Sequence, residues 1–450
     1  MEKYFVFTGE NTAVANGQMN NSAVKNLWRS FCLTEGELDI EEADGFIFRL
    51  GETPLPELAP NREYALSVSE TGAAVVGKDY GALMRGFLSL LMKIEYGDGT
   101  FMIKAVEEQS EYTVKNRMIH ICVFPENDLY YIKRLIRLCA LCQYTHIVLE
   151  FWGMLRFDCQ PELAWTQAFT KDEVRSLIKE ARELGIEPVP MFNELGHASQ
   201  SRCCFGKHTV LDQNPRLRYL FTPDGWAWNL HREETFDLFK KVRGELYELF
   251  GEGEYFHIGC DEAYYYTHHD SEREHLHEHL ARLTSEVAGE GRRPMVWMDM
   301  MIEAYKHPNT TASCRPEDVE RFVGALDPAT VAVDWQYYVT KADVPSTLEL
   351  AARGLDVIGA PWCESANYEA VVATVAGNGL HGVMLTTWHR LKEKMPSILG
   401  CAKKMGAVTF PWSLYNHHQL HTETATMMRR VSFEGGSYAD FGWAKEQIEI

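Results

Sequence analysis

The feature that most limits the fold of this chain is a repeated alternation of short apolar segments with longer amphipathic ones, which begins at Arg117. Such an alternation is typical of βα units arranged around a parallel sheet. Helical segments between the apolar ones include residues 172–184 and 233–250. Eight units close a barrel, so we predict an α/β fold with a (β/α)8 TIM barrel. The eight candidate strands begin near Met118, His146, Glu187, Tyr255, Pro294, Val331, Asp356 and Gly382.

The segment before the barrel has a different pattern. Residues 64–68 alternate like a strand, residues 73–77 could pair with them, and residues 80–94 carry apolar side chains at helical spacing. We therefore predict a small non-catalytic α+β domain before the barrel. The predicted boundaries are 1–110 for this domain, 111–410 for the barrel and 411–450 for a C-terminal helical appendage.

The charge balance excludes several classes of partner. The chain has 44 basic and 64 acidic residues, and the resulting net charge of -20 would repel phosphate backbones and anionic lipids. We expect neither nucleic acid nor a membrane as a partner, and no leader is visible in the first ten residues. The 11 cysteines are scattered, several within apolar runs, which favours reduced thiols and a cytoplasmic location.

Two segments have spacings that resemble metal sites. Cys139 and Cys142 lie within the helical-looking residues 131–142, where a spacing of three places both on one buried face. The histidines between His268 and His279 alternate with Glu and Arg, which favours a solvated helix face. We expect no metal and no organic cofactor. No GxSxG serine elbow, HExxH helix or phosphate loop is present, which argues against esterase, metalloprotease and nucleotide chemistry.

The fourth candidate strand ends in the segment 257–263, HIGCDEA, which carries the adjacent acids Asp261 and Glu262. Active sites of barrels lie at the carboxyl ends of the strands, and the connections after strands three and four are unusually long. In extended backbone the two side chains diverge, which favours two separate roles over one shared proton. Retaining glycosidases with a protein nucleophile hold their carboxylates about 5 Å apart across the bond, whereas the substrate-assisted class uses the acetamido oxygen of the sugar. Adjacent acids fit the assisted class.

The motif His257-x-Gly259-x-Asp261-Glu262 resembles the fingerprint of glycoside hydrolase family 20. The order of the other segments is also similar from about residue 115 to about residue 402, most closely to the hexosaminidase D branch. The first hundred residues resemble, more weakly, the α+β domain that often precedes the barrel in this family. The resemblance implies a retaining exo-β-N-acetylhexosaminidase that removes terminal GlcNAc or GalNAc from an oligosaccharide through an oxazolinium intermediate.

The resemblance also implies roles for individual residues. Glu262 would be the general acid and base, and Asp261 would bind the acetamido N–H and stabilise the intermediate. Arg117 matches an arginine that holds sugar hydroxyls, Glu150 matches an acidic residue at the end of the second strand, and His197 matches a histidine that supports the acid pair.

Aromatic residues recur at predicted strand ends and are expected to line the sugar site. A single tryptophan is more typical of a core, but recurrence at several strand ends favours stacking on sugar faces. The predicted residues are Trp297, Trp335, Tyr337 and Trp388.

Three segments depart from the family pattern. Trp388 is followed by His389 where many members have Gly-Glu, and residues 151–153 lack an acidic pair of the hexosaminidase D branch. Residues 361–364, PWCE, stand where many members carry the tyrosine that holds the acetamido oxygen, so that contact falls to Tyr337 or a loop tyrosine. Two alternatives stay open: a carbohydrate-binding protein that has lost turnover, and a glycosidase of a more specialised amino-sugar glycan. The preferred sugar is open, and a homodimer is compatible with the sequence.

Overall fold

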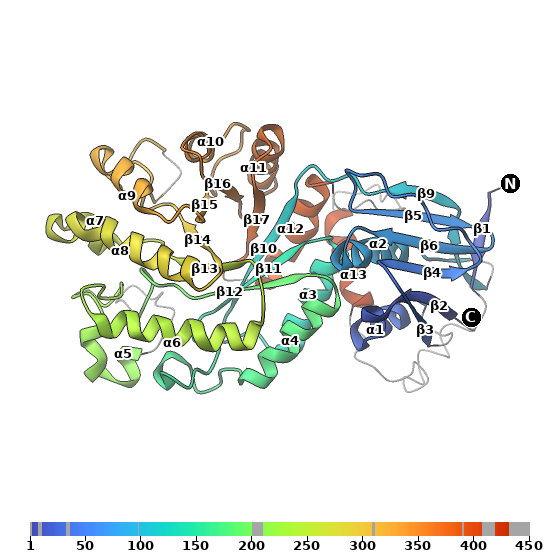
Figure 1. Ribbon diagram of the computed structural model, residues 1–450, viewed down its shortest axis with the longest axis horizontal. Helices are drawn as coiled ribbons and strands as arrows, with labels where there is room; N and C mark the ends of the chain where they lie inside the picture. Colours follow the sequence, from blue (N-terminus) through green and yellow to red (C-terminus); the bar gives the residue numbers. More distant parts are fainter. Residues whose placement is uncertain are drawn as a thin grey trace.

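The computed structural model describes residues 2–7, 11–32, 37–97, 99–199, 210–307, 311–388, 391–406 and 419–431. It consists of an amino-terminal mixed α/β region followed by a closed barrel, which lie on the right and the left of Figure 1. Within the described residues, no helix has the length and apolar character that a membrane crossing requires.

The barrel has eight parallel strands, as predicted, and closes by pairing of its first strand with its last. Each strand begins at or close to the predicted position. Almost all strand residues are buried, because one face of the sheet packs inside the barrel and helices cover the other. The strands are β10 (Asn116–Val123), β11 (His146–Phe151), β12 (Glu187–Met191), β13 (Tyr255–Gly259), β14 (Arg293–Trp297), β15 (Val331–Trp335), β16 (Asp356–Ala360) and β17 (Gly382–Thr386).

Helices alternate with these strands on the outside of the barrel (Figure 1). The helix α4 begins with a capping box between Thr170 and Glu173, which satisfies the free N–H groups of its first turn. Cys139 and Cys142 are fully buried free thiols at the end of α3, in agreement with the predicted core role. The helices are α3 (Leu129–Leu141), α4 (Lys171–Glu183), α5 (Val210–Gln213), α6 (Glu233–Phe250), α7 (Tyr264–His268), α8 (Asp270–Gly289), α9 (Val319–Ala325), α10 (Pro345–Ala352), α11 (Ser365–Asn378) and α12 (Leu391–Lys404), with short 3-10 turns at Pro161–Leu163, Pro215–Leu220 and Pro316–Asp318.

The barrel interior is apolar over most of its length. Polar side chains enter it toward the carboxyl ends of β10 and β11, at His120, Cys122 and Glu150, and His257 of β13 packs on Trp297. The apolar interior is formed by Met118, Val148, Val189, Met191, Tyr255, Met295, Trp297, Val331, Val333, Ile358, Ala360 and Met384.

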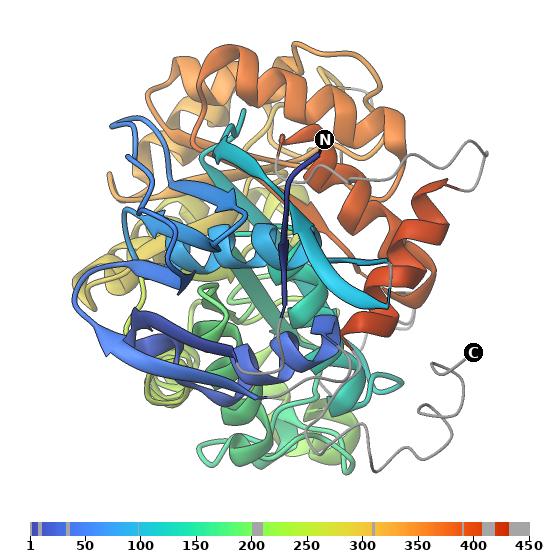
Figure 2. The same cartoon turned by 90° about the vertical axis from the view of Figure 1, so that its right-hand side faces the viewer.

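The amino-terminal region contains a six-stranded sheet of order β3-β2-β4-β6-β5-β9 and a three-stranded sheet of order β1-β8-β7. The predicted strands at residues 64–68 and 73–77 are confirmed as the antiparallel pair β5 and β6. The helix α2 packs on this sheet and against α3 of the barrel. Figure 2 shows the amino-terminal strands in front of the barrel. The elements are β1 (Tyr4–Val6), β2 (Asn11–Asn16), a 3-10 turn (Gly17–Met19), α1 (Ser22–Cys32), β3 (Leu38–Ala43), β4 (Ile47–Gly51), β5 (Tyr64–Ser69), β6 (Gly72–Gly77), α2 (Tyr80–Met92), β7 (Glu95–Gly97), β8 (Thr100–Lys104) and β9 (Val106–Gln109).

One helix is described within the predicted C-terminal appendage. It is α13 (Gln419–Arg430), which packs against α3 and α12 of the barrel. Arg134 of α3 donates to the main-chain oxygen of Met428 at 3.1 Å. The other appendage residues, except Val431, lie outside the described ranges.

Candidate active site

Asp261 and Glu262 lie directly after β13, at the carboxyl end of the barrel. The backbone turns sharply there, with φ values of 70° at Gly259, 80° at Cys260 and 52° at Glu262. Positive φ values at non-glycine residues cost on the order of 1–3 kcal/mol each and are typical of functional sites. A Cβ at Gly259 would lie 2.4 Å from Cγ of Asn193, so the turn requires glycine. The expected divergence of the two acids assumed extended backbone, and this turn instead directs both toward one histidine.

His197 joins the two carboxylates. Its Nε2 lies 3.3 Å from Oδ2 of Asp261 and 3.0 Å from Oε2 of Glu262. The ring packs on Trp226, with centroids 4.3 Å apart. Close packing also fixes the loop, because a Cβ at Gly196 would lie 1.9 Å from the main-chain oxygen of Asp261. The structure therefore brings His197 together with the acid pair, as the family resemblance implied.

Asn193 holds Asp261 from the other side, and the sequence analysis missed it. Its Nδ2 donates to Oδ1 of Asp261, and its Oδ1 accepts the main-chain N–H of Cys260 at 3.1 Å. An amide two residues beyond the third strand was the available signal. Asn193 and His197 thus fix Asp261 through both of its carboxylate oxygens.

The two acids have different environments. The side chain of Asp261 is 6% exposed and that of Glu262 is 27% exposed. Glu262 also accepts a hydrogen bond from the hydroxyl of Tyr264 at 3.3 Å. A buried, fixed acid beside a more accessible one suits two chemical roles, one in positioning and one in proton transfer.

A third carboxylate, Asp299, supports this pair from two residues beyond β14. Its Oδ2 accepts the main-chain N–H of Glu262 at 2.9 Å, and its Oδ1 accepts Nε1–H of Trp335 at 3.2 Å. Burial raises the pKa of Asp299 well above its usual value, and the charges of Asp261 and Glu262 add to the rise. The sequence analysis missed Asp299, although an acid just after Trp297 at a strand end was a usable signal. Asp299 fixes the backbone of the proton-transfer candidate.

Aromatic residues from three strand ends gather around Tyr337. Its ring centroid lies 4.9 Å from that of Trp335 and 5.6 Å from that of Trp362, and its hydroxyl accepts Nε1–H of Trp388 at 2.6 Å. We call these four residues the Tyr337 cluster. Burial raises the pKa of Tyr337 well above its usual value, which keeps it a neutral phenol. Because Trp335 also bonds Asp299, the cluster is linked to the acid pair.

Two other predicted residues lie inside the barrel. Trp297 is fully buried, with its ring 5.8 Å from that of Trp388 and 4.5 Å from that of His257, and its role in lining the sugar site stays a prediction. Glu150 is also buried, and its Oε2 lies 2.8 Å from Nε2 of His120. The role of Glu150 in sugar binding stays a prediction. His389, the predicted departure after Trp388, lies outside the described residues.

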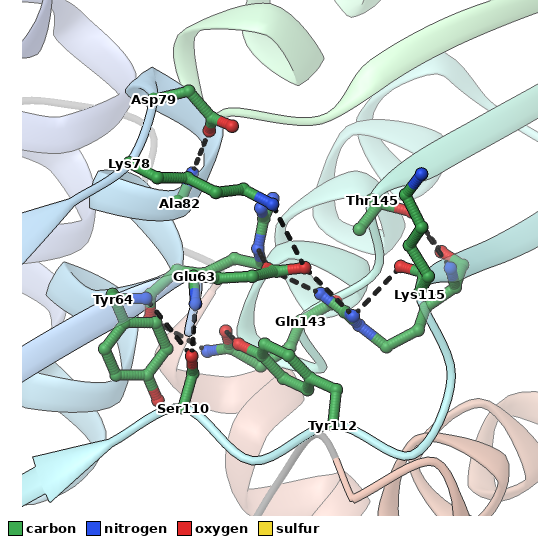
Figure 3. Close-up of polar contacts among 12 residues, drawn as sticks. Glu63, Tyr64, Lys78, Asp79, Ala82, Ser110, Tyr112, Lys115, Gln143 and Thr145 are labelled. Atoms are coloured by element: carbon green, nitrogen blue, oxygen red, sulfur yellow. Dashed lines mark hydrogen bonds and ion pairs between the residues drawn. The ribbon is translucent and has the colours of Figure 1, made fainter. Parts of the chain in front are cut away.

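The prediction that Arg117 holds sugar hydroxyls is wrong. Arg117 is the second residue of β10, at the amino-terminal end of the barrel, and is fully buried. Its Nη2 lies 3.1 Å from Oε2 of Glu63, and its guanidinium lies 3.5 Å from the ring centroid of Tyr112. Figure 3 labels Glu63 and Tyr112. Nη1 of Arg117 donates to the main-chain oxygens of Val114 and Lys115, and its Nε donates to that of Gln143. The contact with Glu63 joins the barrel to the amino-terminal region, at the end opposite to Asp261.

A buried ion pair anchors the loop that carries Asn193 and His197. Glu194 lies in this loop, and Nη1 of Arg243 on α6 donates to both of its carboxylate oxygens, at 3.0 and 3.1 Å. Both side chains are fully buried. Arg243 also bonds Glu286 of α8 at 2.7 Å and Glu290, the residue after α8, at 2.9 Å. Burial raises the pKa of Glu194 to about 7, although Arg243 opposes the rise. This network joins the loop after β12 to the helices on either side of β13.

In comparisons with known proteins, the chain matches a family model and a curated protein. Residues 148–362 match the family model described as glycosyl hydrolase family 20, catalytic domain. A chitooligosaccharidolytic β-N-acetylglucosaminidase of Bombyx mori is 24% identical over 98 residues, which span 22% of this chain and 16% of that protein.

Solved structures share the fold at low identity. An exo-β-N-acetylglucosaminidase from Vibrio harveyi superimposes with a TM-score of 0.68 at 14% identity, over 97% of this chain and 76% of that one. A β-N-acetylhexosaminidase from Bacteroides fragilis gives a TM-score of 0.67 at 16% identity, over 97% and 95% of the two chains. The matched residues 148–362 contain the Asp261–Glu262 pair, and this part of the barrel is therefore similar to the catalytic domain of glycosyl hydrolase family 20.

Proposed function

We propose that this chain is a retaining exo-β-N-acetylhexosaminidase that removes a terminal, non-reducing GlcNAc or GalNAc by substrate-assisted catalysis. One observation carries the proposal: two adjacent acids of different exposure, joined by His197, lie at the carboxyl end of a barrel similar to the family 20 catalytic domain. The Vibrio harveyi enzyme of the same fold was solved with N-acetylglucosamine, which supports a sugar of this class. The motif His257-x-Gly259-x-Asp261-Glu262 and the segment order support a place near the hexosaminidase D branch.

In the proposed first step, Glu262 gives its proton to the glycosidic oxygen as the bond from that oxygen to the anomeric carbon breaks. The acetamido oxygen of the same sugar attacks the anomeric carbon and closes an oxazolinium ring. Asp261 accepts a hydrogen bond from the acetamido N–H, which orients the carbonyl and stabilises the positive charge of the ring. The greater exposure of Glu262 suits it to protonate the leaving group. Asp261, which His197 and Asn193 contact, is suited to orient the acetamido group.

In the second step, the carboxylate of Glu262 takes a proton from water, which attacks the anomeric carbon and opens the ring. Two inversions leave the configuration retained. His197 and Asp299 act as positioning residues, because each contacts the acid pair. We propose that Tyr337, a neutral phenol beside Trp335 and Trp388, supplies the contact to the acetamido oxygen that residues 361–364 lack.

The test compares aryl β-glycosides of GlcNAc, GalNAc and glucose with the native chain and Glu262→Gln. We expect turnover of acetamido sugars alone, and a loss of about 100-fold or more in the variant. The matched control is Glu278→Gln, an exposed glutamate on α8, which should keep the native rate. Equal turnover of the glucoside would contradict the assisted mechanism.

The alternative of a sugar-binding protein without turnover is favoured by one observation, the Cys363 position that many family members fill with tyrosine. Calorimetry with free GlcNAc distinguishes the two. Binding by folded native protein that hydrolyses none of the three glycosides would support the alternative over the enzyme.

A further inference from the structure

Three potential metal ligands of different chemistry meet inside the barrel. His120 and Cys122 are two apart on β10 and therefore face the same side of the strand. Glu150 on β11 is the register partner of Cys122. One donor atom of each residue lies within 4.8 Å of the other two, and in the described part of the chain no other group of three His, Cys, Asp or Glu residues meets this condition.

The spacing of the donors is close to that of a zinc site. Nε2 of His120 lies 2.8 Å from Oε2 of Glu150, and Sγ of Cys122 lies 3.7 Å from the same oxygen. Tetrahedral zinc, with bonds of about 2.0–2.3 Å to N, O and S, places neighbouring donors about 3.3–3.7 Å apart. The sulfur-to-oxygen spacing already fits, and the nitrogen-to-oxygen spacing must open by about 0.5 Å.

The cluster also carries a buried polar group that the protein does not satisfy. His120 is fully buried, and its Nδ1 has no hydrogen-bond partner among the described residues. Its ring lies 4.8 Å from that of Trp388 and 5.8 Å from that of Trp297, in a largely apolar interior. Barrel interiors are normally filled by branched apolar residues, so an imidazole, a thiol and a carboxyl together are unusual filling.

We propose that His120, Cys122 and Glu150 bind one thiophilic divalent ion of the Zn²⁺ type. A set of N, S and O donors favours zinc, cobalt or cadmium over magnesium and calcium, which prefer oxygen alone. The site is separate from the acid pair and does not use Asp261 or Glu262. Three protein ligands leave a fourth position for water. Binding releases the thiol proton and the proton shared by His120 and Glu150.

The second part of the proposal is that the bound ion inhibits the enzyme, and this part rests on the proposed function. Ligation breaks the hydrogen bond between His120 and Glu150 and moves the imidazole by about 0.5 Å. That imidazole packs on Trp388, which in turn bonds Tyr337. The metal therefore disturbs the Tyr337 cluster and, through it, the bound sugar.

The first test measures metal binding without activity. The full chain is stripped with chelator, kept reduced and titrated with Co²⁺, whose thiolate complexes show a charge-transfer band in the near ultraviolet. We expect one cobalt per chain, displacement by zinc, and loss of the band in Cys122→Ser. The control Cys159→Ser changes a partly exposed thiol far from β10 in sequence and should keep the band. If Cys122→Ser fails to fold, Cys122→Ala takes its place. Absence of the band in the native chain, or its persistence in the variant, would overturn the proposal.

The second test measures aryl glycoside hydrolysis with and without zinc. We expect a fall of about fivefold or more in the native chain, reversed by chelator, and a rate of Cys122→Ser that zinc leaves unchanged. Cobalt binding without hydrolysis of any substrate would uphold the metal site and contradict the proposed function. Hydrolysis without cobalt binding would uphold the proposed function and overturn the metal site. Hydrolysis that zinc does not slow, in a chain that binds cobalt, would overturn the proposal that the ion inhibits the enzyme.

Discussion

Two buried arginine–glutamate pairs lie at opposite ends of the barrel. At the amino-terminal end Arg117 pairs with Glu63, and at the carboxyl-terminal end Arg243 pairs with Glu194. Both arginines are fully buried. The first pair joins β10 to the amino-terminal region, whereas the second anchors the loop that holds the acid pair. The same interaction thus stabilises a domain contact at one end and shapes the active site at the other, as expected for barrels.

The two pairs also differ in the excess charge around them. Glu63 faces three cations, Arg85 at 2.8 Å, Arg117 at 3.1 Å and Lys78 at 3.9 Å. Burial alone would raise the pKa of Glu63, but Arg85 and Arg117 outweigh it and hold the pKa below its usual value. At the other end Arg243 faces three carboxylates, of which Glu286 also pairs with Arg282 at 2.9 Å, and burial raises the pKa of Glu194 to about 7. The surroundings, more than the pair itself, set the protonation of each glutamate.

The largest effect on stability and activity is expected for Arg243→Met, and it should exceed that of the matching change at Arg117. Arg243→Met leaves Glu194 buried without its partner, so the free energy of unfolding should fall by about 3–5 kcal/mol. The folded fraction should also lose about tenfold or more in kcat, because small displacements of catalytic groups are costly. Denaturant unfolding and hydrolysis rates check both effects.

Arg117→Met is the matched variant at the other end. Glu63 keeps Arg85, so we expect a smaller loss of stability, about 1–3 kcal/mol, and a kcat close to native. A tenfold loss of kcat in Arg117→Met, or an unchanged kcat in Arg243→Met, would contradict the division of roles between the two ends.

A smaller effect is expected for Asp299→Asn. The amide keeps an acceptor for Trp335 but cannot also accept the main-chain N–H of Glu262. We expect kcat to fall by roughly tenfold with little change in KM, since the group acts on the acid and not on ground-state sugar contacts. A change confined to KM would indicate that Asp299 contacts the sugar.

The smallest effect is a difference in pH dependence between Glu63→Gln and Glu194→Gln. The pKa of Glu63 in the folded state lies below the ordinary 4.5, so its stabilisation is present above pH 4.5 and is lost on acidification. The pKa of Glu194 is raised to about 7, so its contribution is present below pH 4.5 and is lost as the pH rises through 7. The free energy of unfolding should therefore be measured against pH for the native chain and both variants. The difference between native chain and Glu63→Gln should shrink as the pH falls, and the difference between native chain and Glu194→Gln should shrink as the pH rises. Parallel curves for both variants would contradict the assigned protonation states.

The barrel was predictable because its strands are short apolar runs with sharp ends, and the motif at residues 257–262 was predictable because it is contiguous. The contacts of Asp299 and Asn193 were not, since they depend on which strand ends face each other in space. The sugar-binding role of Arg117 was predicted from the family resemblance alone, because in the sequence this residue lies before the first candidate strand. The turn at Cys260 and Glu262 was missed because positive φ at non-glycine residues has no reliable sequence signal.

The central claim is that the acetamido oxygen of the substrate acts as the nucleophile beside Asp261 and Glu262. The most direct test measures kcat/KM for aryl β-GlcNAc substrates whose acetamido methyl carries none, one, two or three fluorine atoms. Fluorine withdraws electrons from the carbonyl oxygen and weakens it as a nucleophile. We predict that kcat/KM falls steadily with each added fluorine; values that are the same across the series would contradict the account.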